Sequence, residues 1–300
     1  MSKAYLFYNP LAGQGKAIED LKLLEAILDA DDLVYCDMTK GETYSHQLFS
    51  LTEDDCLVLC GGDGTLNRFL NLIDISEIPC EVLYFPIGTG NDFAHDLGYR
   101  YESNPFPVKE YFQNLPTVMV QGKKYRFLNA VGFGLDGYCC EEGDKLRQES
   151  EDPVNYTKIA IKGLLGAFQP RNATITVDGV THTYKKVWIA PTMHGRYYGG
   201  GMKAVPSQNR ESGELSVMVW HGSSKLGTLV AFPGIFKGTH IKHKKHIAIL
   251  TGKTITVTFD RPAPLQIDGE TIPDVSRYEV VTNIAPKQQI KEKQTADITE

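Results

Sequence analysis

The sequence predicts an α/β amino-terminal domain built on a parallel sheet, followed by a mostly β carboxy-terminal domain. Over roughly the first 120 residues, a short apolar run, a glycine-bearing turn and an amphipathic segment repeat in that order, which is typical of strands that alternate with helices. After about residue 125, polar and apolar residues alternate instead. We therefore expect an α/β domain over 1–125, a β-sandwich over 126–285, and a polar tail over 286–300 that frays or straps back on the first domain.

The first domain is expected to contain four strands. Tyr5–Tyr8 is the first, Asn9–Gly15 is the loop after it, and an apolar stripe marks the next helix. That stripe consists of Ile18, Leu21, Leu24, Ile27 and Leu28. The second strand ends near Cys36, and "CLVLCGGDGTLNRFLNLI" and "EVLYFPIGTGNDFAHDLG" each supply a further strand, turn and helix. The turns of such a sheet open at one edge, where α/β sheets bind ligands.

The second domain is expected to be rich in strands. "ATITVDGVTHTYKKVWIAP" alternates polar and apolar residues around Asp178-Gly179, a two-residue hairpin signal. Further strand-like runs are "ELSVMVW", "HIAIL", "TITVTF", "PLQID" and "RYEVVTNI". Only "NYTKIAIKGLLGAF" and "SSKLGTLVAFPGIF" have a helical pattern there, and Pro233 interrupts the second.

Composition limits the class of protein. The chain has 300 residues, 42% of them hydrophobic, which is enough for one large or two ordinary domains. It shows neither a signal-peptide pattern nor an apolar run near the ~20 residues that cross a bilayer, so we expect a soluble cytoplasmic protein. The six cysteines lack CxxC spacing and are interpreted as small buried hydrophobes. A net charge of −6 argues against nucleic acid as a partner.

The glycine-rich turns indicate phosphate binding. Gly61, Gly62 and Gly64 leave the backbone bare, so that an anion can approach the free N–H groups at the start of a helix. Asp63 repels phosphate and therefore implies an intervening Mg²⁺, a hydroxyl group or a water. The turn Gly88-Thr89-Gly90-Asn91-Asp92 offers further donors, and Lys16 brings a cation to the same edge.

The alternative is that these glycines serve turn geometry alone, which is common for a single turn; three turns at one edge are stronger evidence. The first turn does not match GxxxxGK[ST], and neither "CGGDGT" nor "IGTGND" matches GxGxxG. P-loop and Rossmann dinucleotide sites therefore lose support.

Three segments, "NPLAGQGKA", "GGDGTLN" and "PIGTGNDFA", resemble successive signatures of the diacylglycerol kinase catalytic-domain family, which includes bacterial lipid kinases and sphingosine and ceramide kinases. The resemblance continues through "NAVGFGLDG", "YYGGGMKAVP", "ESGEL" and "LQIDGE", as far as about Pro286. It implies an NAD-kinase-like nucleotide-binding domain, a β-sandwich, and a cleft where ATP meets a lipid hydroxyl.

The resemblance also implies roles for matching residues. Positions that match the ATP site are Asn9, Gly13, Thr39, Gly62, Asp63, Gly64, Thr65, Leu66, Asn67 and Thr89. Asp63 and Asp92 match acidic positions that organise the phosphates and Mg²⁺, and relatives often carry a lysine in the loop that holds Lys16. Lys162 matches a lysine on a helix of the second domain, and Glu270 matches the proposed proton acceptor.

A separate argument from chemistry supports Glu270. Attack of an alcohol on a γ-phosphoryl group usually uses a carboxylate that receives the proton. Asp268-Gly269-Glu270 provides two carboxylates at the end of an apolar strand. The alternative for this turn is a hairpin corner with solvated acids, and the alternative for Lys162 is an exposed helix face.

The sequence departs from the family pattern at named positions. Arg68 stands where the family commonly has glutamate. Bacterial relatives often bind a structural Mg²⁺ through "DDG", whereas this chain has Glu211-Ser212-Gly213. Ser212 is a poorer ligand than aspartate, so that a second metal site at Asn209, Ser212 and Glu214 is doubtful. "MHGRYYGGGMK" either shapes an acceptor pocket or is a flexible loop.

Access to a lipid is expected from the segment "HIKHKKHIAIL". It concentrates Lys242, Lys244 and Lys245, and cations attract an anionic leaflet. His240, His243 and His246 lie among them, so that charging of histidines predicts tighter adsorption at mildly acid pH. The alternative is a basic edge strand that discourages unwanted pairing.

The sequence therefore predicts an ATP- and Mg²⁺-dependent lipid kinase, with diacylglycerol as the leading acceptor. Glu270 and Asp268 form the acidic turn, Asp63 positions Mg-ATP, and Lys162 is a catalytic candidate. Transient membrane association is expected and a homodimer is left open. The alternatives are a kinase for another alcohol, such as a sphingoid base, a monoacylglycerol or a polyol, and a nucleotide-binding regulatory module without transfer activity.

Overall fold

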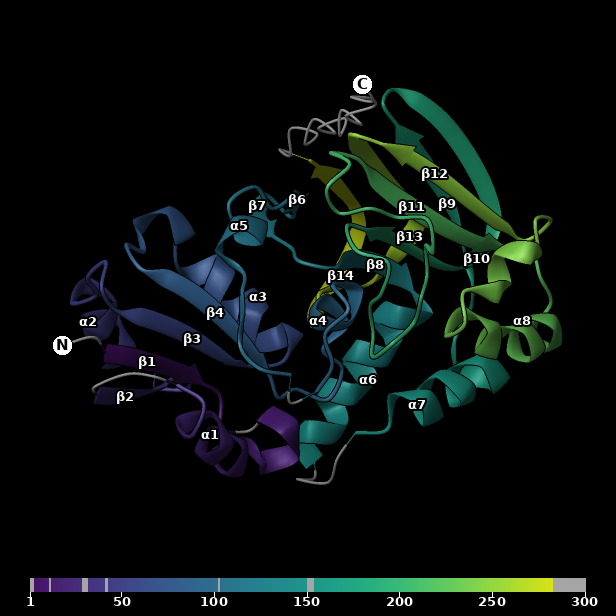
Figure 1. Ribbon diagram of the computed structural model, residues 1–300. Coiled ribbons are helices and arrows are strands. Elements are labelled where there is room, and N and C mark those ends of the chain that lie inside the picture. The colour runs from purple at the N-terminus through teal and green to yellow at the C-terminus, as the bar shows by residue number, and fades with distance from the viewer. Residues whose placement is uncertain are drawn as a thin grey trace, which may run out of the picture.

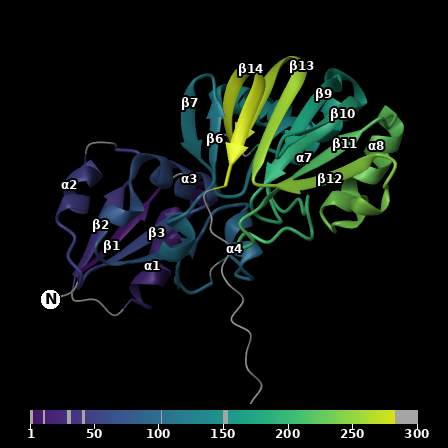
Figure 2. The same cartoon turned by 90° about the horizontal axis from the view of Figure 1, so that it is seen from above.

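The computed structural model describes residues 3–10, 12–28, 32–40, 43–101, 103–149 and 154–282. The predicted tail over 286–300 lies outside these ranges. The chain forms two sheets that lie side by side, with helices of the first domain facing the second (Figures 1 and 2). The predicted order, an α/β domain followed by a β-rich domain, is confirmed.

The first sheet has the strand order β2-β1-β3-β4-β5. Its strands are β1 (Lys3–Tyr8), β2 (Asp32–Asp37), β3 (Cys56–Gly61), β4 (Glu81–Pro86) and β5 (Phe106–Pro107). β1 to β4 pair in parallel, and β5 is antiparallel to β4. Apolar side chains are buried on both faces of this sheet, as expected for parallel strands covered by helices.

The connections of the first sheet are mostly helical. The helices are α1 (Ala17–Glu25), α2 (Thr43–Phe49), α3 (Asp63–Leu72), α4 (Asp92–Asp96) and α5 (Lys109–Phe112), with 3-10 segments at Ala12–Gly15 and Ile75–Glu77. In α1 the predicted apolar stripe is narrower than expected: Leu21 and Leu24 are buried, whereas Ile18 and Ile27 are exposed. Ala17 and Asp20 take the remaining buried positions on the helix.

The second sheet has the strand order β12-β11-β10-β8-β13-β14-β6-β7, and β9 pairs with β10 and β13. Its strands are β6 (Thr117–Val120), β7 (Lys123–Arg126), β8 (Ala130–Gly134), β9 (Arg171–Val177), β10 (Val180–Met193), β11 (Leu215–His221), β12 (Ile247–Gly252), β13 (Thr254–Ile267) and β14 (Glu270–Val281). The predicted hairpin at Asp178-Gly179 is present, and both residues have positive φ, as a tight hairpin turn requires.

One helix of the second domain was not expected from the sequence. The domain contains α6 (Leu135–Glu149), α7 (Tyr156–Lys162), a π-helix (Gly163–Ala167), α8 (Lys225–Ala231), and 3-10 segments at Phe232–Ile235 and Thr239–Lys242. α6 escapes a periodicity search because its buried positions include Asp136, Gly137 and Gly143 rather than large apolar residues. The helices predicted around residues 155–168 and 223–236 are present, the second ending in a 3-10 turn at Pro233.

The second sheet begins inside the range predicted for the first domain. β6 pairs with β14 and β7 pairs with β6, so that sheet membership changes between α5 and Thr117 rather than at residue 125. All six cysteines are free. No helix in the described part of the chain is both long and apolar enough to span a membrane.

Candidate active site

The glycine turns pack tightly against one another at the carboxyl edge of the first sheet. A Cβ atom added to Gly88 would lie 2.2 Å from the Cα atom of Gly62, so the turns after β3 and β4 require glycine at their contact. Gly13 has φ +59°, and an added Cβ would lie 2.7 Å from the carbonyl oxygen of Ile87. The predicted convergence of three turns is therefore present.

A cavity of about 580 Å³ opens at this edge. It is lined by Gly13, Lys16, Gly88, Thr89, Gly90, Asn91, His95, Tyr99, Arg100 and Tyr101. The first six residues of this set, Gly13 to Asn91, were predicted from sequence. The basic and aromatic residues at 95–101 were not, because they follow the glycine motif on a short helix and its exit loop. The combination of bare backbone, two cations and aromatic rings fits a nucleotide polyphosphate.

Asp63 uses its carboxylate to join elements of the protein. Its Oδ2 atom accepts a hydrogen bond from the Asp92 amide at 2.8 Å, and Oδ1 accepts from the Phe93 amide at 2.9 Å. Asn129 donates through Nδ2 to Oδ1 at 2.9 Å. The first N–H groups of α4, which were expected to face a phosphate, are therefore directed at Asp63 instead.

Asp92 is buried beside Asp63 and contacts the second domain. Its carboxylate accepts hydrogen bonds from the amides of Gly200 at 2.8 Å and Gly201 at 2.7 Å. Burial, followed by the charge of Asp63, raises the pKa of Asp92 to about 7, although the two glycine amides oppose this shift. A Cβ on Gly90 would lie 3.5 Å from Asp63 Oδ2 and 3.8 Å from Asp92 Oδ2, so both carboxylates border the same small space.

Glu270 lies over the first turn of α3. A Cβ atom placed on Gly64 would be 4.0 Å from Glu270 Oε1, so that the exposed Glu270 carboxylate faces the residue next to Asp63. The turn that carries it is a tight hairpin between β13 and β14, in which Asp268 and Gly269 both have positive φ. Glu270 therefore lies close to the residue that follows Asp63, although neither carboxylate is part of the cavity lining.

Asp268 holds the segment where the domains meet. Its carboxylate accepts hydrogen bonds from the backbone amides of residues 128, 129 and 130 at 2.5, 2.7 and 2.9 Å, and from Asn67 Nδ2 at 2.9 Å. Burial raises its pKa, and these donors act against that shift. Asp268 is therefore a positioning residue, and Asn67 contacts the second domain rather than the cavity.

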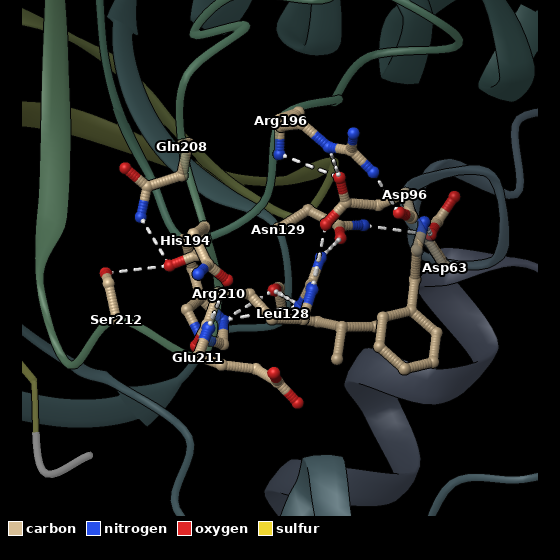
Figure 3. A network of polar contacts seen from close by, with 12 residues as sticks. Asp63, Asp96, Leu128, Asn129, His194, Arg196, Gln208, Arg210, Glu211 and Ser212 are labelled. Atoms are coloured by element: carbon tan, nitrogen blue, oxygen red, sulfur yellow. Dashed lines mark hydrogen bonds and ion pairs between the residues drawn. The ribbon is translucent and has the colours of Figure 1, made fainter. Parts of the chain in front are cut away.

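A buried ion cluster closes the two domains on each other (Figure 3). Asp96 of α4 pairs with Arg196 Nε at 2.7 Å and with Arg210 Nε at 2.9 Å. Arg210 also donates to the Leu128 carbonyl oxygen at 2.9 Å and to Asn129 Oδ1 at 3.1 Å. Burial pushes the pKa of Asp96 up, but the two arginines outweigh it and the pKa is lowered.

A group of buried polar side chains beneath the hairpin was missed by the sequence reasoning. Among the described residues, Asp136 Oδ2, Tyr198 Oη, Gln266 Nε2 and Thr271 Oγ1 are buried without a hydrogen-bond partner. Burial raises the pKa of Asp136 to about 6, and the nearby Gln266 and Tyr198 side chains are among the groups that lower it. Gln266 accepts from the Gly269 amide at 2.9 Å, which links this group to the Glu270 turn. Asp136 lies in "GFGLDG", a matched motif from which no role was inferred.

The remaining predicted residues lie outside the cavity lining. Thr39 donates to Asp37 Oδ1 through its amide and hydroxyl groups, which closes a turn after β2. Asn9 accepts from the Ala12 amide at 2.9 Å within the first loop. Gly61 packs against Thr65, whose Oγ1 would be 2.3 Å from an added Cβ. Lys162 is exposed at the end of α7, on the outer surface of the second domain.

The loop proposed for a structural Mg²⁺ closes on itself through hydrogen bonds. The Asn209 carbonyl oxygen accepts from Ser212 Oγ at 2.8 Å, and Asn209 Oδ1 accepts from the Glu211 amide at 3.0 Å. Gln208 Nε2 donates to the Glu214 carbonyl oxygen at 2.9 Å. No three His, Cys, Asp or Glu side chains within the described ranges gather into a metal site. The residues therefore do not fit the structural cation that the resemblance implied.

Two protein-family models together match most of the chain. The model described as "Diacylglycerol kinase catalytic domain" matches residues 3–115, and "YegS C-terminal NAD kinase beta sandwich-like domain" matches residues 129–288. A Mycobacterium tuberculosis protein named diacylglycerol kinase is 24% identical over 269 residues, covering 86% of this chain and 85% of that protein.

Solved structures share the fold. A Bacillus anthracis structure has a TM-score of 0.64 at 21% identity and covers 93% of this chain and 92% of that one. Another, titled as a diacylglycerol kinase from the same organism, has a TM-score of 0.59 at 20% identity, with 93% and 94% coverage. At these identities the structures support the fold.

Proposed function

Because the chain belongs to the diacylglycerol kinase catalytic-domain family, we propose that it transfers the γ-phosphate of ATP to a lipid hydroxyl group, with diacylglycerol as the leading acceptor. One observation supports this proposal: the Gly88 turn that lines the cavity packs on Gly62, directly before the first turn of α3, and the Glu270 carboxylate faces Gly64 in that turn. A triphosphate held by the turns would present its γ-phosphoryl group toward an acid from the other domain.

The polyphosphate would be held mainly by backbone. α3 begins after Gly62 without a side-chain cap, so its first-turn N–H groups are left for a ligand. Lys16 and Arg100 line the cavity and would neutralise part of the phosphate charge. The turns are rigid because their glycines touch, so the donors are positioned before the nucleotide binds.

A Mg²⁺ ion that arrives with ATP would lie beside Asp63 and Asp92. Asp63 and Asp92 border the space beside Gly90, and Mg²⁺ usually binds through one or two carboxylates together with substrate phosphates. The raised pKa of Asp92 reflects, after burial, the adjacent charge of Asp63, and a cation would relieve that repulsion. When bound, the ion would neutralise charge that develops on the phosphates.

Proton transfer would fall to Glu270. As the acceptor hydroxyl attacks the γ-phosphorus, its O–H proton passes to the Glu270 carboxylate, and the bond from the γ-phosphorus to the β-bridging oxygen breaks to release ADP. Asp268 holds the hairpin that carries Glu270 through its contacts with residues 128–130.

Transfer of labelled γ-phosphate to a panel of acceptors tests the proposal. The panel contains diacylglycerol, monoacylglycerol, a sphingoid base and glycerol, each with and without Mg²⁺. Labelled phosphatidic acid is the expected product. Label on a different acceptor would assign another alcohol, and ATP binding without label transfer to any acceptor would leave a nucleotide-binding module.

A further inference from the structure

We propose that one face of the second domain docks on an anionic lipid bilayer. This surface, called here the basic apolar face, consists of α7, the π-helix, α8 and the 3-10 segments Phe232–Ile235 and Thr239–Lys242. The π-helix continues α7 and packs against α8, and the two 3-10 segments pack against each other. α8 lies at the end of the second domain that is remote from α3 in both views (Figures 1 and 2).

Acidic residues are absent from the two segments that build this face. The chain contains 37 aspartate and glutamate residues and has a net charge of −6, yet none occurs within residues 154–177 or 215–259. The fold brings these two acid-free segments together, although they are far apart in the sequence. The two segments are therefore cationic on a protein that is acidic as a whole, and the nearest carboxylates are those of α6, which packs against α7.

Helix α8 carries two of its aliphatic side chains outward. On α8, Leu226 and Val230 are 71% and 74% exposed, whereas Thr228 between them is 0% exposed. The buried Thr228 hydroxyl is satisfied by the Ser224 carbonyl oxygen at 2.9 Å. This is the reverse of an ordinary surface helix, which buries its apolar stripe, and it exposes aliphatic groups four residues apart on one side.

The neighbouring segments continue the same pattern. Ile161 on α7 and Leu165 on the π-helix are four residues apart and 42% and 65% exposed. Leu164 is buried in the core, so the helix is anchored by its other side. Phe236 and Ile241 on the 3-10 side of the face are also exposed. Exposed apolar groups gathered over adjoining elements mark an interaction site.

Lysines surround these apolar groups. Exposed lysines on or beside the face are Lys158, Lys162, Lys225, Lys237, Lys242, Lys244 and Lys245. None of them forms an ion pair with a carboxylate from the described part of the chain. Free cations around an aliphatic centre match a leaflet in which anionic headgroups surround an acyl interior.

A second copy of the chain suits this face less well. A twofold interface would bring the same lysines of both copies together, and no carboxylate within the acid-free segments could pair with them. An anionic bilayer instead supplies both the negative charge and the apolar phase. The proposal rests on the proposed lipid acceptor for its biological purpose, but docking itself requires neither ATP nor acceptor.

One histidine of this region takes no part in the surface. His240 was grouped with the lysines in the sequence, but it is completely buried, stacks on Trp220, and contacts the Ala204 carbonyl oxygen at 2.9 Å. Burial lowers its pKa. The tighter membrane adsorption expected at mildly acid pH therefore does not involve His240. Docking is therefore assigned to the lysines and the aliphatic side chains.

Vesicle sedimentation with the full chain tests the docking surface. The vesicles contain phosphatidylcholine alone or with 30% phosphatidylglycerol as the chosen probe, without diacylglycerol or ATP. We expect wild type to bind the anionic vesicles at least about a hundredfold more strongly than the neutral ones, because each lysine near the leaflet contributes about fivefold. Leu226→Ser with Val230→Ser should reduce that binding about tenfold, and Lys242, Lys244 and Lys245→Gln should separately reduce it about a hundredfold.

Matched controls separate docking from general surface effects. Leu23→Ser with Phe49→Ser changes two exposed apolar residues of the first domain, and Lys123, Lys124 and Lys185→Gln removes three exposed lysines outside the face. Both controls should bind like wild type. In addition, Val230→Trp should show a blue-shifted emission with anionic vesicles that brominated lipids quench.

The proposal is overturned if the Leu226 and Val230 variant binds anionic vesicles like wild type, or if that variant loses self-association while vesicle binding persists. Activity is measured separately on a short-chain, water-soluble diacylglycerol, for which docking variants should match wild type. Vesicle binding without phosphorylation of any lipid would refute the proposed function and leave docking intact. If wild type phosphorylates a lipid but does not bind vesicles, docking is refuted and the proposed function remains.

Discussion

Asp96 and Arg210 form a buried ion pair across the two domains, with 2.9 Å between Oδ2 and Nε. Both side chains are at most 5% exposed, and Arg196 completes the cluster from the second domain. The pair lies next to the contact between Asn129 and Asp63. The contact between the domains therefore includes a charge pair, Asp96 and Arg210, that is shielded from solvent.

Asp96→Ala should destabilise the protein by about 3–5 kcal/mol, because it leaves a buried guanidinium without its partner. Asp144→Ala is the matched control, since its pair with Arg147 is exposed and such pairs contribute about 0–1 kcal/mol. Urea denaturation measures both free energies of unfolding. Equal, small losses in the two variants would contradict a role for the cluster in holding the domains.

Glu270→Gln should lower kcat by about 10²- to 10⁴-fold, because the amide cannot receive the hydroxyl proton. KM for ATP should change little, since Glu270 lies on the hairpin of the other domain. Glu81→Gln, an exposed residue at the start of β4, is the control. Near-normal turnover of the Glu270 variant would remove it from the mechanism.

Gly88→Ala should destabilise the protein by at least about 2 kcal/mol and weaken ATP binding, because the new methyl group would enter the backbone of Gly62. Gly166→Ala serves as the comparison, since nothing lies within 4 Å of its added Cβ. Thermal unfolding and equilibrium ATP binding report the two effects. Tolerance of Gly88→Ala would mean that the turns are not fixed by this contact.

Asp136→Asn should become more stable relative to wild type as pH rises from about 4 to 7. Burial raises the folded pKa of Asp136 to about 6, above the unfolded value near 3.9. Between these two pKa values the folded protein therefore binds more protons than the unfolded chain. The free energy of unfolding of wild type then falls as pH rises, by about 1–3 kcal/mol in total at pH 7. A pH-independent difference between the two proteins would show that Asp136 ionises normally.

Chelation of divalent ions should leave the Tm of the nucleotide-free protein unchanged to within about 1 °C, because the Asn209 to Glu214 loop is closed by its own donors. A structural cation would instead stabilise the folded state, and its removal would lower Tm by several degrees. Differential scanning calorimetry with and without EDTA distinguishes the two results. Catalysis should still require Mg²⁺, supplied with ATP.

Much of the fold could be predicted because its signals are local. The strand, turn and helix units of the first domain and the hairpin at Asp178-Gly179 each occupy a short stretch of sequence with its own pattern. The turn at Glu270 was found because a glycine between two acids follows an apolar strand. α6 was missed because Asp136, Gly137 and Gly143 occupy buried positions that a periodicity search treats as polar or neutral.

The contacts between the domains could not be predicted, because they join residues far apart in the chain. Asp268 contacts Asn67 across 201 positions, and Asp96 contacts Arg210 across 114. Nothing in the sequence around Asp268 distinguishes a side chain that binds backbone amides from one that receives a proton. The same limit concealed the outward aliphatic side of α8, since Leu226 and Val230 resemble core residues until their burial is known.

The position of the Asp268 and Glu270 hairpin also has a consequence for synthesis on the ribosome. The first domain emerges early, but the residues that brace its edge come from the hairpin between β13 and β14, the last two strands within residues 3–282. Domains generally fold in order during translation. In a nascent chain that already has its glycine turns, the proposed transfer to an alcohol would therefore have to wait until the hairpin that carries Glu270 had been made.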